Sequence, residues 1–228
     1  FVLSGFLITS ILAQEHAAWG TIDFRAFYVR RALRLGPALV LALAGGALLL
    51  LLHGGPAGKF DWLAILYSAL YVSNFALIFG GLRLGMLTPT WSLSVEEQFY
   101  SIWPFVMSRL LPQSRAAIVK LILGGIVATW VLRAGLHWSA WKFYSWPLFG
   151  AANHLIFARA DGLLCGALVA LVAHWGLLPD AVRYARPLKA LGWLCAAILA
   201  GILHYGPGLI EGGVYGPAIF YFWYACVS

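Results

Sequence analysis

Two adjacent glutamates, Glu96 and Glu97, stand in an otherwise apolar stretch that reads WSLSVEEQFY from Trp91 to Tyr100. A charged side chain at the centre of a bilayer costs roughly 2.5–3.5 kcal/mol on insertion scales. Such residues are therefore paired, lie near an interface or line a wet cavity, and each setting favours a functional site. Helix capping is the alternative, because Ser94 and Glu97 match a capping box at a helix start. Capping leaves Glu96 unexplained.

Three arginines, Arg30, Arg31 and Arg34, lie in the segment FRAFYVRRALR over residues 24–34. Arg31 and Arg34 are three residues apart and would share one face of a helix. Paired guanidinium groups grip phosphates bidentately, so we predict an anion clamp for a phosphate-bearing cofactor on the cytoplasmic side. The alternative is a positive anchor that touches acidic lipid headgroups.

A third charged group, Arg159-Ala-Asp161, opens a later apolar segment. Asp161 either caps the first turn of that helix, pairs with Arg159, or belongs to a functional site. Gly162 and Gly166 follow with the spacing of a small-residue packing face. The sequence shows no His, Cys or acidic spacing typical of a metal site, and we predict none.

The elements that must position these residues are long apolar segments. The sequence is 62% hydrophobic and 10% charged, whereas soluble domains carry about 25% charged residues. A membrane-spanning helix needs about 20 apolar residues, which predicts an all-α, multi-pass helical bundle with a single domain over residues 1–228. The candidate segments are 1–13, 36–52, 62–80, 89–108, 116–136, 150–175, 187–204 and 214–228. The chain opens and ends inside apolar runs, so we expect it to be truncated at both ends.

The net charge of +7 comes mostly from Lys and Arg between these segments. That distribution indicates contact with membrane lipids rather than nucleic acid. The basic connections fall on one side of the membrane only if one of segments 62–80 and 89–108 does not cross fully. We predict that segment 89–108 is re-entrant or broken, because it holds both glutamates and Pro104. Segment 24–34 is predicted to be a separate interfacial helix, capped by Asp23 and ended by a bend at Gly36-Pro37.

Four motifs in this order resemble the acyltransferase 3 family of membrane acyltransferases. They are FVLSGFLI over residues 1–8, the arginines of residues 30–34 before Pro37, WSLSVEEQFY over residues 91–100, and Arg159-Ala-Asp161. The resemblance covers residues 1 to about 175. It implies transfer of an acyl group, usually acetyl, from cytoplasmic acyl-CoA to a hydroxyl of a carbohydrate or glycolipid. It also implies a multi-pass protein of the bacterial inner membrane, with no tightly bound cofactor.

The resemblance also assigns roles to residues of this sequence. The candidate catalytic residues are Glu97, Glu96 and Asp161; the donor-binding residues are Arg31, Arg34 and Arg30; the motif and packing residues are Ser4, Gly5, Trp91 and Ser94. The family carries a catalytic His in a helix ahead of the FVLSGFLI motif. We therefore expect this chain alone to lack its general base and to be inactive. A transporter or flippase is the competing hypothesis, because broken helices and intramembrane charges also mark transport paths.

Overall fold

The computed structural model describes residues 1–53, 62–79, 84–178, 189–190, 192–195 and 197. The chain divides into two compact units, Phe1–His174 and Trp175–Ser228. Every candidate site residue lies in the first unit. Segment 214–228 lies outside the described residues, as does much of segment 187–204.

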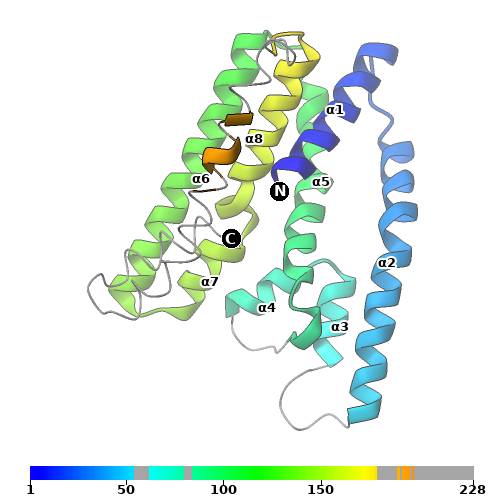
Figure 1. Ribbon diagram of the computed structural model, residues 1–228, viewed down its shortest axis with the longest axis vertical. Helices are drawn as coiled ribbons and strands as arrows, with labels where there is room; N and C mark the ends of the chain where they lie inside the picture. The colour runs from blue at the N-terminus through cyan, green and yellow to red at the C-terminus, as the bar shows by residue number, and fades with distance from the viewer. Residues whose placement is uncertain (54–61, 80–83, 179–188, 191, 196, 198–228) are drawn as a thin grey trace. The chain divides into compact units, whose positions relative to one another are not determined.

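The first unit is built from helices, and no strand occurs among the described residues. Their order is α1 (Val2–Trp19), α2 (Phe24–His53), α3 (Trp62–Ala69), α4 (Ser73–Phe79), a 3-10 turn (Gly85–Leu87), α5 (Thr90–Leu110), α6 (Arg115–Phe143), α7 (Trp146–His154) and α8 (Ile156–His174) (Figure 1). Three stretches, Phe24–Leu52, Arg115–Phe143 and Trp146–His174, are long and apolar enough to cross a membrane. The prediction of an all-α, membrane-spanning bundle is confirmed.

Glycines bring α1 and α8 into close contact. A Cβ atom on Gly5 would lie 2.8 Å from Cα of Leu163, and one on Gly166 would lie 2.7 Å from the backbone nitrogen of Phe6. Only a residue without a side chain allows backbones to approach this closely. The Gly162–Gly166 face of α8 packs closely on α1, as its spacing indicated, and Gly5 of α1 lies in the same contact.

Segment 89–108 was predicted to be re-entrant or broken; the break is wrong, because α5 runs through it without interruption, and the re-entrant path stays a prediction. Pro104 lies inside this helix and is fully buried, and such tertiary packing can outweigh the local cost of an interior proline. Segment 62–80 is the broken one. It forms α3 and α4, of 8 and 7 residues, each only about 10–12 Å long at 1.5 Å per residue. Tyr71, with a φ of 55°, lies at the break.

The helix connections of the first unit lie at two opposite ends. The α1–α2 and α5–α6 connections lie at one end of the unit, and the α6–α7 connection lies at the other (Figure 1). We call the end that carries the α1–α2 and α5–α6 connections the basic end. It is defined by Arg25, Arg30, Arg109 and Arg115. Segment 62–80 is the interrupted apolar segment, and an incomplete crossing there would satisfy the charge count as well as one at segment 89–108.

The predicted interfacial helix is not separate. Residues 24–34 are the first turns of α2, which continues through Pro37 to His53. Gly36 explains the missing break, because a residue without Cβ clashes less with the ring of the following proline. The predicted cap is confirmed, since the amide of Ala26 donates to Oδ1 of Asp23 at 2.9 Å.

Candidate functional site

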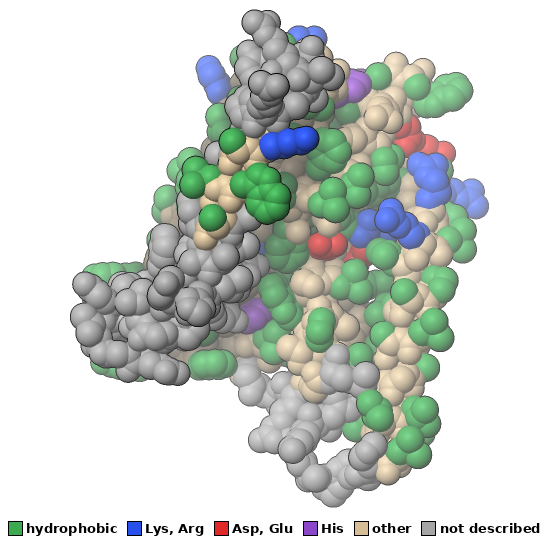
Figure 2. Space-filling model, in the orientation of Figure 1, with side chains coloured by type: hydrophobic (Ala, Val, Ile, Leu, Met, Phe, Trp, Pro, Cys, Tyr) green, Lys and Arg blue, Asp and Glu red, His purple; other side chains and the backbone are tan. Residues whose placement is uncertain are grey.

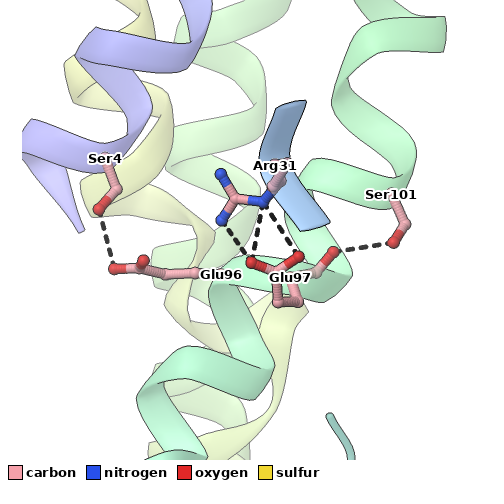
Figure 3. Close-up of polar contacts among 5 residues, drawn as sticks. All are labelled: Ser4, Arg31, Glu96, Glu97 and Ser101. Carbon is pink, nitrogen blue, oxygen red and sulfur yellow. Dashed lines mark hydrogen bonds and ion pairs between the residues drawn. The ribbon is translucent and has the colours of Figure 1, made fainter. Parts of the chain in front are cut away.

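The two glutamates of α5 point to different helices. Consecutive residues on a helix are about 100° apart, so Glu96 faces α1 and Glu97 faces α2 (Figure 3). The hydroxyl of Ser4 donates to Oε1 of Glu96 at 2.9 Å. The structure therefore brings together Ser4, Glu96, Glu97 and Arg31, which the sequence analysis singled out in three separate motifs.

Glu97 forms a charge-assisted pair with Arg31. Nε of Arg31 lies 2.8 and 3.0 Å from the two carboxylate oxygens, and Nη2 also bonds Oε1. The two side chains are only 18% and 16% exposed, so the pair is largely shielded from water. The guanidinium also lies 3.5 Å from the ring centroid of Tyr100, within the range of a cation–π contact. Nη1 is the guanidinium nitrogen that Glu97 does not engage (Figure 3).

The Arg31–Glu97 pair is one step of an antiparallel ladder between α2 and α5. Its steps are about one helical turn apart, and each of them uses a side chain of α2. Phe24 stacks on Phe105 at 4.6 Å, the hydroxyl of Tyr28 donates to the carbonyl of Ser101 at 2.9 Å, and Arg31 binds Glu97. The pair thus fixes the depth at which α2 meets α5.

Arg30 and Arg34 have different surroundings from Arg31. Nη2 of Arg30 lies 3.3 Å from Oε2 of Glu15 on α1, and 59% of the Arg30 side chain is exposed. Arg34 is exposed, and no ion pair joins it to another described residue. The structure therefore does not bring the predicted clamp of Arg31 and Arg34 together around one point; Arg31 binds a carboxylate instead.

Ser94 does not cap a helix, so the capping alternative is wrong. The helix begins at Thr90, just after Pro89, and its first turn precedes Ser94. The hydroxyl of Ser94 instead donates to the carbonyl of Thr90 at 3.0 Å and lies 2.8 Å from the hydroxyl of Ser73 on α4. Ser94 and Ser73 are fully buried, so this hydroxyl pair joins α4 to α5.

Gln98 is a residue that sequence reasoning missed. Its amide nitrogen donates to the carbonyl of Tyr71 at 3.0 Å and to Oδ1 of Asn74 at 2.9 Å. Gln98 therefore holds the α3–α4 break beside the glutamates. Burial and the negative charge of Glu97 raise the pKa of Tyr71, against the opposing charge of Arg31, so its hydroxyl stays protonated near the pair. An amide side chain directly after two glutamates in an apolar segment was the available signal.

Asp161 lies well inside α8 and cannot cap its first turn. It accepts hydrogen bonds from Arg133 and, at 3.1 Å, from Nε1 of Trp130, both on α6. Cζ of Arg159 lies 5.8 Å from the ring centroid of Trp91. The rings of Trp91 and His154 form a T-shaped contact with their centroids 4.8 Å apart. The sequence analysis did not single out Arg133, although it is a lone charge in an apolar segment. The free-energy cost of a charge in the bilayer applies to it as it does to Glu96.

The residues that the structure describes contain no group of three His, Cys, Asp or Glu side chains that could hold a metal ion. The arrangement on α1, α2 and α5 instead supplies two carboxylates, a hydroxyl and a guanidinium within a shielded space. Such groups can hold an anion, orient a hydroxyl and move a proton.

The sequence profile of the family described as "Acyltransferase domain" matches residues 1–228. The "Putative peptidoglycan O-acetyltransferase YrhL" of Bacillus subtilis is 35% identical over 94% of this chain and 35% of its own length. The peptidoglycan O-acetyltransferase OatA of Listeria monocytogenes is 31% identical over 96% of this chain and 37% of its own length. The chain thus spans about a third of the length of these relatives. No solved structure matches it.

Proposed function

Since the chain belongs to the acyltransferase family, we propose that it transfers an acetyl group from cytoplasmic acyl-CoA to a hydroxyl of peptidoglycan. The relatives named above are called peptidoglycan O-acetyltransferases, which supports a carbohydrate acceptor in the cell wall. A bacterial inner membrane is the location that fits both substrates. The basic end faces the cytoplasm in this proposal, because Lys and Arg concentrate on cytoplasmic loops.

The Arg31–Glu97 pair, with Ser4 and Glu96 beside it, is the observation that carries the proposal. In the reaction the acceptor oxygen attacks the thioester carbon, a base takes the hydroxyl proton, and the C–S bond breaks to release the thiol. Negative charge develops on the carbonyl oxygen in the transition state, and a preorganised cation stabilises it. Arg31 supplies that cation, and its Nη1 is the nitrogen directed away from Glu97.

The two glutamates have distinct roles in this proposal. Glu97 is a positioning residue, because its carboxylate fixes the guanidinium of Arg31 through both oxygens. Glu96 binds Ser4 through Oε1, which leaves Oε2 for exchange of a proton with the base or the acceptor. The family resemblance implies a His as the base, and in this proposal Glu96 handles the proton together with it.

The test uses the protein at its full natural length in membranes, with radiolabelled acetyl-CoA and purified peptidoglycan. We expect label in the glycan, and a large loss of it for Arg31→Gln and for Glu97→Gln at normal protein abundance. Arg25→Gln is the matched control, because it removes an exposed arginine from the same helix outside the ladder. Unlabelled glycan beside an active control enzyme would contradict the proposal. Label that crosses the membrane without reaching glycan would favour the transporter hypothesis.

A further inference from the structure

Two interruptions between helices of the first unit meet beside α5. Helices α3 and α4 are separated around Tyr71, and α7 and α8 are separated at Leu155. Helix α4 lies against α7, because a Cβ atom on Gly150 would lie 2.7 Å from Cα of Ile78 (Figure 1). An interruption leaves backbone carbonyl groups without partners inside the helix, and lipid supplies none. Both interruptions therefore need donors from elsewhere in the protein.

Asn74 and Gln98 supply these donors and also bind each other. Nε2 of Gln98 donates to the carbonyl of Tyr71 at 3.0 Å, and Nδ2 of Asn74 donates to the carbonyl of His154 at 3.1 Å. Nε2 of Gln98 also donates to Oδ1 of Asn74 at 2.9 Å. We call these two residues the amide pair. Because Gln98 directly follows Glu97, the amide pair ties both interruptions to α5 at the level of the reactive glutamates.

Tyr71 adopts a backbone conformation that a tyrosine rarely takes. Its φ of 55° lies in the left-handed region, which favours glycine. It ends α3 in a Schellman motif, since its amide donates to the carbonyl of Ser68 at 3.2 Å and the amide of Val72 donates to that of Tyr67 at 2.9 Å. Glycine would fill this position at lower cost. Strained residues of this kind gather at functional sites, where the surrounding structure holds them.

The side chain of Tyr71 supplies what glycine would lack, a hydroxyl near the reactive pair. Burial raises the pKa of this hydroxyl, and the charges of Glu97 and Arg31 also act on it, so it stays protonated and can donate. No hydrogen bond joins it to another residue that the structure describes. The Arg31–Glu97 pair keeps some exposure, and Figure 2 shows acidic side chains beside basic ones on the face that carries α2.

We infer that Tyr71 donates a hydrogen bond to the carbonyl oxygen of the thioester, beside Arg31, and that the amide pair positions Tyr71 for this role. The inference rests on the proposed function and adds a second donor to it. Charge on that oxygen grows as the acceptor attacks, so a donor fixed beforehand binds the transition state more tightly than the ground state. Asn74 and Gln98 are positioning residues, because they touch Tyr71 and His154 rather than the substrate.

The test measures kcat and KM for acetyl-CoA, with the full-length protein in membranes and peptidoglycan as acceptor. We expect Tyr71→Phe to lower kcat about 100-fold and to leave KM within about twofold, because loss of one such donor commonly costs 100- to 1,000-fold. Gln98→Met should lower kcat about tenfold in the same way. Tyr144→Phe is the matched control, since Tyr144 also has a positive φ but is 93% exposed. It should change neither value.

A double variant tests whether Gln98 acts through Tyr71. If it does, Tyr71→Phe/Gln98→Met should lose no more activity than Tyr71→Phe alone, because coupled residues are not additive. A loss equal to the product of the two single losses would overturn the positioning role. Ser73→Ala is the structural control, because it removes a buried hydroxyl pair between the same two helices, α4 and α5. Its kcat per folded protein should be unchanged, and a loss equal to that of Gln98→Met would also overturn the positioning role.

Failure of this inference and failure of the proposed function give different results. Full activity of Tyr71→Phe, beside an inactive Arg31→Gln, would overturn the inference and leave the reaction standing. A rise in KM for Tyr71→Phe at unchanged kcat would also overturn it, because the hydroxyl would then bind the ground state as tightly as the transition state. Absence of acetyl transfer by the wild type would overturn both.

Discussion

Helices α2 and α8 are both long and apolar, and each joins its neighbours through an arginine–carboxylate pair, yet they are held differently. Helix α8 lies against the backbone of α1 at Gly5 and Gly166. In the Trp146–His174 stretch, which α7 and α8 form together, 44% of the apolar 18-residue window is buried inside the protein. The corresponding fraction for α2 is 11%, and its ladder to α5 uses side chains. Close backbone packing makes α8 part of a scaffold, whereas α2 can move or admit a ligand without loss of that scaffold.

The different packing of α2 and α8 predicts different roles for the two ion pairs. Arg133–Asp161 joins two helices of the scaffold, so its loss should reduce stability. Arg31–Glu97 positions a cation beside Glu96, so its loss should reduce activity.

The largest effect should come from Glu97→Gln, which removes the charge that fixes Arg31. We expect acetyl transfer per folded protein to fall about 100-fold or more, because loss of preorganised charge stabilisation commonly costs that much. The thermal midpoint in detergent should change little. Asp161→Asn is the comparison variant. If it lost as much specific activity as Glu97→Gln, the two ion pairs would not differ in role, and the catalytic role predicted for Asp161 would be favoured.

A methyl group in the α1–α8 contact should give the largest loss of stability. Gly166→Ala places a Cβ against backbone atoms that cannot rotate away, so the helices must separate, and overpacking costs about 1–3 kcal/mol or more. The free energy of unfolding is measured in detergent or bicelles. Gly135→Ala is the control, because a Cβ there meets no atom within 4 Å. Equal stability of the two variants would refute the scaffold role of this contact.

Breaking the second ion pair should have a smaller effect. We expect Arg133→Met to lower the free energy of unfolding by roughly 2 kcal/mol, since it leaves Asp161 without its charged donor. The double variant Arg133→Met/Asp161→Leu should lose less than the single one, because it removes both charges. A double variant less stable than either single variant would argue against a simple pair.

The contact between α1 and α5 should have the smallest effect. Nε1 of Trp103 donates to the hydroxyl of Thr9 at 2.8 Å in the buried interior. Trp103→Phe removes this bond, and interhelical hydrogen bonds in membranes contribute about 0.6–2 kcal/mol. We expect a loss of about 1 kcal/mol by thermal unfolding, with no loss for the exposed Trp138→Phe. A loss above that of Arg133→Met would reverse the proposed ranking.

The sequence predicts the helical class, the glycine packing face and the importance of Glu96, Glu97 and Arg31, because each depends on local composition or on the cost of charge in lipid. The partners of the charged residues could not be predicted from the sequence. Glu15 for Arg30 and Arg133 for Asp161 come from other helices, and only tertiary packing brings them together. The wrong choice of broken segment has the same origin, because a buried environment overrides the local effect of Pro104.

The contact of Gly5 with Leu163 has a consequence for the order of synthesis. Helix α1 leaves the ribosome before α8, and helices α2 to α7 are synthesised between them. Until α8 is inserted, the glycine face of α1 lacks this partner in the membrane. A chain that stops before α8 therefore carries only the first three motifs, without the helix whose backbone α1 approaches most closely.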